Sequence, residues 1–343
     1  MIKQVKIENF KCFKEETISL KDLTILTGVN SSGKSSLIQA ILFLFFYNEP
    51  NLDIDLHNYI ISLGDFTDLK NKYTNPKKIS AEILNFENKS LKLEVEVGQT
   101  FNINESFKFG LTYLSANRTS LKSINSFNSR NKYGIYGQNI PSFFEKNKNE
   151  PILKELLVNE ADSETLDGQL NYWIRYISNE KELSFDTNKI GSTDIQAIFK
   201  LEKIVDSLKP ENLGIGLSHL ISILTICLAA KKDELIIIEN PEIHLHPLSQ
   251  AKLGEFFAFV ASRGIQIIIE THNDHIINSV CYQEFKNKIK SEDIIIQYKK
   301  SALTPFEEIE IKNGQFFNNS KKENRFPEGF FDATLKEIME INS

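Results

Sequence analysis

The sequence is poor in cysteine and has no excess of basic residues. Its three cysteines, Cys12, Cys227 and Cys281, lack the spacing of metal ligands and give neither a disulfide framework nor a cysteine-based zinc site. A chain with few cysteines and no disulfide framework is typical of a reducing compartment, so we expect a cytoplasmic protein. The formal net charge of -6 over 343 residues leaves no overall basic surface, which counts against tight, nonspecific DNA binding.

Long hydrophobic runs and internal repeats are also missing. The longest notable apolar run, residues 40–47, is too short to cross a membrane, and we interpret it as part of a buried helix. No heptad array of the kind that forms long coiled coils is present. Hydrophobic residues make up 41% of the chain and charged residues 25%, which is typical of a globular protein whose length favours two lobes.

One motif is complete. Residues 28–35 read GVNSSGKS, which matches the phosphate-binding pattern G-x-x-x-x-G-K-S. A strand-like apolar run, residues 23–27, precedes it, and a helix-like run, residues 36–42, follows. A strand that delivers the chain to a tight turn before a helix N-terminus is the context that such a loop needs. The alternative is a Gly/Ser loop with a chance lysine, which the later motifs disfavour.

The residue types of this loop suit a bound triphosphate and a magnesium ion. Gly28 and Gly33 would let the backbone wrap closely around an anion. Lys34 would reach the β and γ oxygens, and the Ser35 hydroxyl would bind Mg²⁺. The residues expected to bind the nucleotide are Gly28, Asn30, Ser31, Ser32, Gly33, Lys34, Ser35 and Ser36.

Two later strands end in side chains that suit the same site. The apolar residues 235–238 lead into Glu239, which predicts a metal-binding carboxylate at the carboxyl edge of a sheet. The apolar residues 267–269 lead into Glu270-Thr271-His272, and a histidine at this edge could contact a terminal phosphate or the attacking water. Taken alone, each feature also fits an ordinary buried strand.

The remaining pattern predicts an α/β fold with a mixed sheet, an antiparallel β subdomain and an inserted helical subdomain. Strands are expected at residues 4–10, 17–20, 79–86, 91–97 and 107–114, with the last three forming the antiparallel sheet. Residues 48–76 are polar and irregular, so we interpret them as an exposed insertion. Apolar residues at helical spacing over residues 141–208 predict the helical subdomain.

After Pro210, helical and apolar strand patterns alternate, which favours a parallel sheet covered on both faces. Helices are expected at 217–230, 248–260 and 274–280, buried strands at 234–238 and 265–269, edge strands at 294–298 and 306–311, and a short helix within 324–340. The predicted divisions are an N-terminal lobe with the phosphate-binding loop at 1–116, the helical subdomain at 117–210, a C-terminal lobe with the later motifs at 211–290 and a final segment at 291–343.

Together these motifs resemble the ATP-binding-cassette (ABC) class of P-loop ATPases, in its prokaryotic RecF/SMC/OLD-like branch. Residues 5–13, VKIENFKCF, resemble that branch's first strand and its N-F-[KR]-x-[FY] turn. Residues 238–247, IENPEIHLHP, resemble its I-D-E-P-E-x-x-L-H-P segment, and Thr271-His272 resembles its switch histidine. Residues 325–332, RFPEGFFD, resemble the W-P-x-G-F-F-D end of a subfamily whose C-terminal domain has no known function.

The resemblance implies ATP and Mg²⁺ as ligands and a head-to-tail homodimer. In this class, ATP lies between the phosphate loop of one copy and the signature segment of the other. Residues 212–218 lie at the signature position, so Gly216 and Ser218 are implied to contact the γ-phosphate bound by a second copy. Ser218 can open a helix and direct its amide and hydroxyl at an anion, or it can be an ordinary N-cap.

Two departures from the family pattern affect catalysis. Pro241 fixes the register, so Glu239 takes the position of the metal-binding Asp and Asn240 that of the catalytic Glu. An amide cannot accept a proton as a general base. Either Glu242 or His272 therefore assists water, or hydrolysis is slow. The first lobe also lacks the glutamine of the Q-loop, and Asn117 or Arg118 lies at that position.

We therefore assign the catalytic roles to Glu239, Asn240, Glu242 and His272, and the metal to Ser35 and Glu239. His244 and His246, with Glu242 nearby, have poor spacing for a closed tetrahedral metal site.

The resulting hypothesis is an ATP-gated dimeric switch. The resemblance implies the ATPase subunit of a prokaryotic anti-phage defence complex, acting with a separate effector protein, either a nuclease or a toxin. One alternative is a RecF-like ATPase for DNA repair or DNA-end binding, which would make nucleic acid a partner. An ATP-dependent nuclease of the OLD type is less favoured, because the segment after His272 shows no acid-rich metal domain. No membrane partner is expected.

Overall fold

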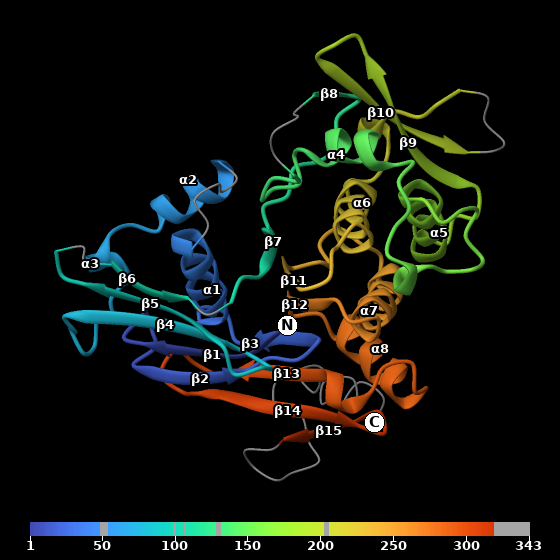
Figure 1. Ribbon diagram of the computed structural model, residues 1–343. Coiled ribbons are helices and arrows are strands. Elements are labelled where there is room, and N and C mark those ends of the chain that lie inside the picture. Colours follow the sequence, from blue (N-terminus) through green and yellow to red (C-terminus); the bar gives the residue numbers. More distant parts are fainter. Residues whose placement is uncertain (49–53, 99–100, 106, 128–131, 202–205, 319–343) are drawn as a thin grey trace, which may run out of the picture.

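Figure 1 shows the computed structural model, in which one central sheet separates two layers of helices and strands. The structure describes residues 1–48, 54–98, 101–105, 107–127, 132–201 and 206–318. The helix expected within residues 324–340 and the tail motif at residues 325–332 lie outside these ranges.

The central sheet has seven strands in the order β15-β14-β13-β3-β12-β11-β7. The five strands from β13 to β7 are parallel, and β14 and β15 add an antiparallel edge, so the expected mixed sheet is confirmed. Their bounds are β3 (Leu23–Gly28), β7 (Gly110–Leu114), β11 (Glu234–Glu239), β12 (Gln266–Glu270), β13 (Ile294–Lys299), β14 (Phe306–Lys312) and β15 (Gln315–Asn318).

Alternating apolar residues explain why this sheet is buried on both faces. In β11, Leu235 and Ile237 join one hydrophobic core, whereas Ile236 and Ile238 join the other. The central residues of β12 divide in the same way. Continuous apolar runs are typical of parallel strands that are covered on both sides.

One face of the central sheet is covered by α1 (Lys34–Asn48) and a five-stranded antiparallel sheet (Figure 1). That sheet has the order β2-β1-β4-β5-β6. Its strands are β1 (Ile2–Glu8), β2 (Glu15–Ser19), β4 (Lys78–Asn85), β5 (Ser90–Glu96) and β6 (Phe101–Glu105).

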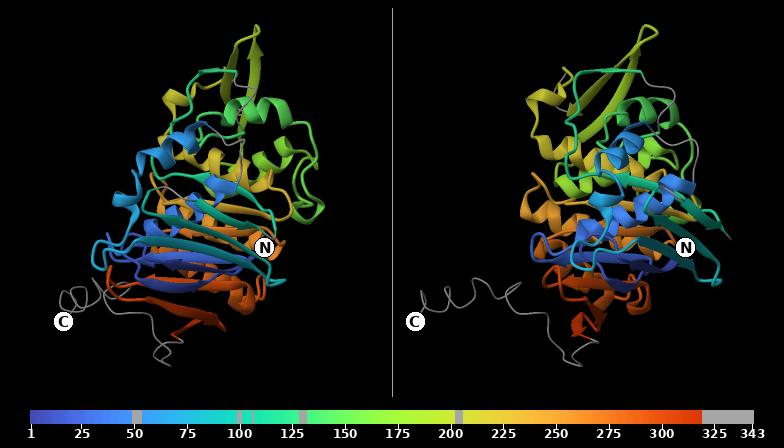
Figure 2. Two further views of the ribbon diagram at one scale, coloured as in Figure 1. Left: turned by 60° about the vertical axis from the view of Figure 1, so that its left-hand side comes forward. Right: turned by 90° about the vertical axis from the view of Figure 1, so that its left-hand side faces the viewer.

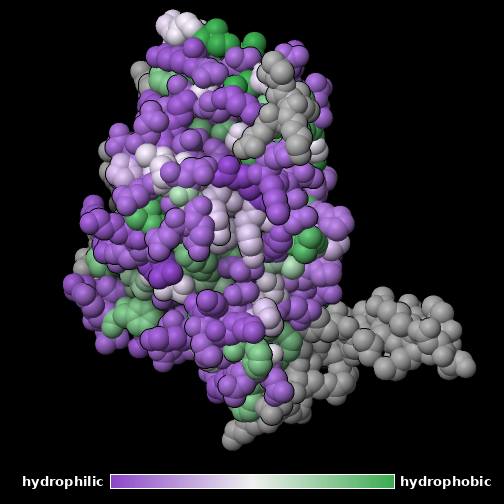
Figure 3. Space-filling view, turned by 90° about the vertical axis from the view of Figure 1, so that its right-hand side faces the viewer, coloured by the Kyte–Doolittle hydropathy of each residue, from purple (hydrophilic) through white to green (hydrophobic). Residues whose placement is uncertain are grey.

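Helices α6 (Ile215–Leu228), α7 (Pro247–Ser262) and α8 (Asp274–Phe285) cover the other face, with α5 (Leu166–Ser178) packed against α6 and α7. The surface on this side is largely hydrophilic, and its hydrophobic residues form separate patches (Figure 3). No helix within the described ranges combines the length and the hydrophobicity needed to cross a lipid bilayer.

The segment expected to be a helical subdomain also contains a small sheet. It has α4 (Ile140–Asn147) and α5, but β8 (Ile124–Ser126), β9 (Leu183–Ile190) and β10 (Asp194–Leu201) form an antiparallel sheet in the order β8-β10-β9. The β9–β10 hairpin forms the tip of the molecule that lies farthest from β15 (Figure 2). Leu183, Phe185 and Thr187 are buried at every second position, which is the period of a strand, so the prediction of helices alone in this segment is wrong.

Other expectations about the strands also need correction. β7 was expected in the antiparallel sheet, but it pairs in parallel with β11 at the edge of the central sheet. β13 was expected at an edge, but it lies between β14 and β3. β6 was not predicted, and the insertion at residues 48–76 contains α2 (Ile54–Ser62) and α3 (Phe66–Leu69). Short apolar runs do not identify their neighbours, because tertiary packing selects the pairing.

β13 carries a buried lysine beside the phosphate loop. Lys299 is only 1% exposed, and it lies opposite Gly28 in the register of β13 and β3. Its Nζ lies 2.8 Å from Glu16 Oε2 and over the rings of Phe13 and Phe306, at 4.9 and 4.7 Å from their centroids. β13 is thereby tied to the hairpin of β1 and β2, which carries Glu16.

Replacing this lysine with methionine tests its structural role. K299M keeps most of the side-chain volume but leaves Glu16 without its cation, so we expect a loss of about 3–5 kcal/mol in the free energy of unfolding. Chemical denaturation measures the change. K300M, at the exposed neighbouring position, is the control and should leave stability unchanged. Equal stability of both variants would contradict the role given to Lys299.

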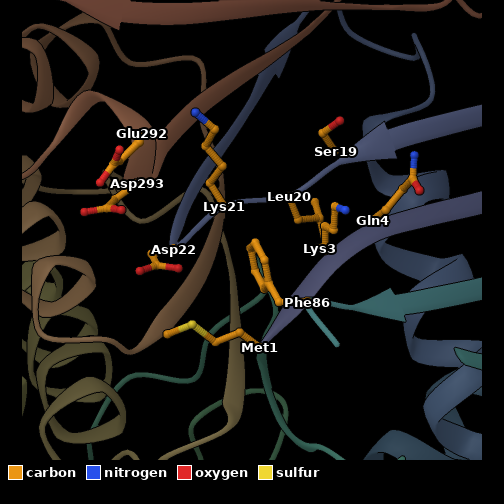
Figure 4. Close-up of a pocket in the computed structure, with 10 residues that line it drawn as sticks. All are labelled: Met1, Lys3, Gln4, Ser19, Leu20, Lys21, Asp22, Phe86, Glu292 and Asp293. Carbon is orange, nitrogen blue, oxygen red and sulfur yellow. The ribbon is translucent and has the colours of Figure 1, made fainter. Parts of the chain in front are cut away.

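A cavity of about 560 Å³ lies at the other end of β3 from the phosphate loop (Figure 4). Phe86 points toward its middle, and Asp22, Glu292 and Asp293 lie together on one side. Burial and the charge of Asp293 raise the pKa of Asp22 to about 6. The lining residues are Met1, Lys3, Gln4, Ser19, Leu20, Lys21, Asp22, Phe86, Glu292 and Asp293.

This pKa predicts a pH-dependent effect of D22N. The folded chain holds the Asp22 proton more tightly than the unfolded chain, in which the pKa of this group is near 3.8, so the contribution of Asp22 to wild-type stability falls as the pH rises from about 4 to 6. D22N removes this loss and should be more stable than wild type above pH 6, with the advantage fading toward pH 4. Urea unfolding across this range measures it, with the exposed D206N as control. A pH-independent difference would contradict the assignment.

Candidate functional site

The phosphate loop joins the carboxyl end of β3 to α1, and its path requires glycine. Gly28 has a φ of +133°, and a Cβ there would lie 2.1 Å from the carbonyl oxygen of Lys299. Gly33 has a φ of +112°, and a Cβ there would lie 2.5 Å from Cys12 Sγ. The loop backbone is therefore closely packed on β13 and on the first turn of the chain.

The two side chains expected to contact phosphate and metal lie at the start of α1. Lys34 is 3% exposed, and its Nζ donates hydrogen bonds to the carbonyl oxygens of Gly28 and Val29, at 3.2 and 2.9 Å. Burial lowers the pKa of Lys34, and the charge of Glu270 opposes this shift. Ser35 is exposed beside it. Within the described residues, Lys34 thus bonds only loop carbonyls and the nearby carboxylate.

The other expected loop residues also suit an anion. Asn30 and Ser31 are exposed at the tip of the loop, and Ser36 is half-buried near Cys12. Ser32 is 1% exposed, and its hydroxyl has no hydrogen-bond partner among the described residues. The first amides of α1 also lack carbonyl partners within the helix. Unpaired donors around a buried lysine are what a bound phosphate would satisfy.

β12 and β11 bring two carboxylates to this edge, where Glu270 and Glu239 are register partners. The Glu270 carboxylate accepts a hydrogen bond from Ser35 Oγ, with O–O distances of 3.3 and 3.4 Å, and lies 3.9 Å from Lys34 Nζ. Burial and the charge of Glu239 raise the pKa of Glu270 to about 7. Glu239 instead accepts a hydrogen bond from the Ala116 amide at 3.2 Å.

A buried arginine holds the turn that follows β11. Asn240 has a left-handed φ of +43°, and its carbonyl oxygen accepts a hydrogen bond from Arg118 Nη1 at 3.1 Å. Arg118 Nη2 donates to the carbonyl oxygen of Glu239. Arg118 is 8% exposed, and burial lowers its pKa to about 10. Arg118, one of the two residues predicted for the Q-loop position, therefore contacts the backbone at the end of β11 through these bonds.

The two residues expected to assist water differ in their surroundings. Glu242 accepts hydrogen bonds from Thr271 Oγ1 at 2.8 Å and from the His272 amide at 3.4 Å. Burial raises the pKa of Glu242. His272 is exposed directly after β12. The Glu242 carboxylate thus already binds the end of β12, while His272 is open to a ligand.

In the segment predicted to be the signature, residues 212–218, α6 begins at Ile215, so the expectation that Ser218 opens this helix is wrong. The N-cap is Gly214, whose lack of a side chain leaves first-turn amides without a cap. Ser218 is 3% exposed, inside the helix. Gly216 is buried as well, and a Cβ there would lie 2.3 Å from the carbonyl oxygen of His244. The exposed residues at this helix start are Gly214 and Ile215.

The two histidines after β11 make local contacts. His246 caps α7, since its Nδ1 accepts a hydrogen bond from the Leu248 amide at 3.3 Å. His244 packs against His219, with ring centroids 5.5 Å apart. Burial, the charge of Arg118 and the nearby His244 lower the pKa of His219 to about 4. These contacts link the turn after β11 to the start of α6.

Glu270 is part of the strand-end motif Glu270-Thr271-His272, but no role was predicted for it from the sequence. The signal was present, because Glu270 ends an apolar strand just as Glu239 does. What the sequence could not supply was the strand order, which puts β12 between β11 and β3. Glu270 is therefore the carboxylate that contacts Ser35.

Two models of known protein families match most of the chain between them. A family model described as "AAA ATPase domain" matches residues 1–207. A second model, whose description names an AAA domain and the AbiEii toxin of a Type IV TA system, matches residues 171–278. No curated protein matches the sequence.

Solved structures share this fold at low sequence identity. One is the SMC head bound to the C-terminal winged-helix domain of ScpA, with a TM-score of 0.60, 13% identity, and coverage of 91% of this chain and 98% of that one. Another is the SMC head with an extended coiled coil, bound to the C-terminal domain of ScpA from Pyrococcus furiosus. Its TM-score is 0.55, with 12% identity and coverage of 100% and 99%. The likeness supports the α/β architecture alone.

The tight contact at Gly216 gives a stability prediction. In G216A the added methyl group would meet the His244 carbonyl, so the start of α6 or the turn after β11 must move. We expect a loss of about 1–3 kcal/mol, the usual cost of overpacking, in spite of the better helix propensity of alanine. Thermal or urea unfolding measures it. G214S is the control, because its Cβ meets nothing within 4 Å and serine is a good N-cap. Wild-type stability of G216A would contradict this packing.

Proposed function

Because the chain belongs to the family of AAA ATPase domains, we propose that it binds ATP with Mg²⁺ and hydrolyses it slowly, as the switch of a homodimer. The observation that carries the proposal is the meeting of Lys34, Ser35, Glu270 and Glu239 at one edge of the central sheet. A cation, a hydroxyl and two carboxylates at the end of a glycine loop are the groups that a magnesium triphosphate requires.

The loop residues have defined tasks in this proposal. The backbone amides of residues 28–35 would bind the phosphates, and Lys34 would leave the loop carbonyls to pair with the β and γ oxygens. The Ser35 hydroxyl, together with a carboxylate from β12 or β11, would hold Mg²⁺, which neutralises charge on the phosphates. Burial of Lys34 strengthens its attraction for an anion.

Slow hydrolysis follows from the side chains near the expected water position. Asn240 offers an amide, which cannot take a proton from water. Glu242 is a carboxylate, but it already accepts hydrogen bonds from the end of β12. His272 is the accessible group, so we assign it the orientation of the attacking water or of the γ-phosphate.

Exposed apolar residues around the phosphate loop and at the starts of α6 and α7 support dimerisation through the carboxyl edge of the central sheet. Val29 in the phosphate loop is 53% exposed, Ile215 at the start of α6 40%, and Leu248 at the start of α7 48%. The uncapped amides at Gly214 and Ile215 would meet the triphosphate held by a second copy. These backbone groups, in place of Ser218, would contact the γ-phosphate bound by the second copy. Gly216 would keep α6 close to the turn after β11.

We further propose that the dimer is the ATPase subunit of an anti-phage system with a separate nuclease or toxin effector. The toxin named in the description matching residues 171–278 supports a defence context. The ScpA-bound SMC heads give a precedent for a separate protein partner on this fold. A RecF-like clamp on DNA is the competing reading, and DNA retained by the ATP-loaded dimer would favour it.

The proposal predicts a mass change and a slow turnover in one preparation. Adding ATP and Mg²⁺ should double the mass measured by light scattering, and phosphate release should stay below about 1 s⁻¹, the low end of ordinary enzyme rates. K34A should abolish both, because the phosphates lose their cation. K14A, at a nearby exposed lysine, is the control and should behave as wild type.

Turnover well above 1 s⁻¹ would refute the slow switch. A chain that binds no ATP, or whose K34A variant keeps full binding, would refute the proposed function as a whole. A mass that stays at one chain with saturating ATP would refute dimerisation and leave the ATP site intact.

A further inference from the structure

Glu270 lies between the two side chains that the phosphate loop presents to a nucleotide. It ends β12, is 7% exposed, and accepts a hydrogen bond from Ser35 Oγ at 3.3–3.4 Å. Lys34 Nζ lies 3.9 Å from the same carboxylate. Glu270 is therefore in contact with both the hydroxyl that would bind magnesium and the cation that would bind phosphate.

Glu239, the strand-end acid assigned to the metal from the sequence, lies one strand farther away. In the sheet, β12 separates β11 from β3, and Glu239 is the register partner of Glu270. The Glu239 carboxylate accepts a hydrogen bond from the Ala116 amide, on the side of β7. Among the described residues, the carboxylate that accepts the hydrogen bond from Ser35 Oγ is that of Glu270.

We propose that Glu270, more than Glu239, is the carboxylate that completes the magnesium site beside Ser35, and that it neutralises Lys34 while no nucleotide is bound. This inference rests on the proposed ATP site. Magnesium prefers oxygen ligands and is usually held by one or two carboxylates together with the phosphates. A carboxylate in contact with the Ser35 hydroxyl can bind the ion directly or through one of its waters.

The position of Glu270 couples magnesium to nucleotide binding. Without metal, the ionised form of the Glu270 carboxylate would repel the triphosphate and compete with it for Lys34. With metal, the same carboxylate would help to hold the ion beside the phosphates. The wild-type chain should therefore bind ATP much more tightly in Mg²⁺ than in a chelator. We call the ratio of these two affinities the magnesium ratio, and it measures the coupling between metal and nucleotide, which is reciprocal. Glu270 should account for most of this ratio.

The test compares the ATP dissociation constant in Mg²⁺ with that in EDTA, using isothermal titration of the full chain. The variants are E270Q, E239Q and E96Q, where Glu96 is an exposed residue of β5 that serves as control. E270Q should lower the magnesium ratio about tenfold, equivalent to 1.4 kcal/mol, and should bind metal-free ATP at least as well as wild type. E239Q should keep a magnesium ratio closer to that of the wild-type chain than E270Q does.

Two results would overturn the inference. E239Q could lose the magnesium ratio while E270Q keeps it, which would return the metal to Glu239. E270Q could instead raise the affinity equally in Mg²⁺ and EDTA, which would make Glu270 a counter-ion of Lys34 alone. E270D, whose carboxylate reaches one methylene less far, should give an intermediate ratio and covers the case in which E270Q does not fold. Failure of the wild-type chain to bind ATP at all would instead refute the proposed function.

Discussion

The order of the parallel strands is the constraint on which the whole site depends. β3 lies between β12 and β13, so the phosphate loop begins where two neighbouring strands also end. On one side, the backbone of β13 approaches so closely that only glycine fits at position 28. On the other side, β12 brings Glu270 against the first turn of α1. Any other neighbour for β3 would separate these groups.

A second set of contacts joins the turn after β11 to the start of α6. Arg118 binds the carbonyl oxygens of Glu239 and Asn240, and Gly216 allows α6 to lie against the carbonyl of His244. In the proposed dimer, the turn belongs to one nucleotide site and the helix start to the other. A shift in one would then move the other, because the start of α6 packs directly on the backbone of this turn.

The sequence predicted the strongly periodic parts well. α6, α7, α8, β11 and β12 were predicted within a few residues, because long apolar patterns and the phosphate loop are local signals. The pairing of β7 with β11, the central position of β13 and the β9–β10 hairpin were missed. Glu270 and Lys299 became informative only once strand order and burial were known, since both act through residues distant in sequence.

A crystal structure of the full chain with a nonhydrolysable ATP analogue and Mg²⁺ would test the proposed site most directly. We expect the triphosphate inside the loop of residues 28–35, with Lys34 Nζ moved from the loop carbonyls to the phosphates and the metal between Ser35 and the end of β12. An empty loop at saturating analogue, or a nucleotide bound elsewhere on the chain, would contradict it.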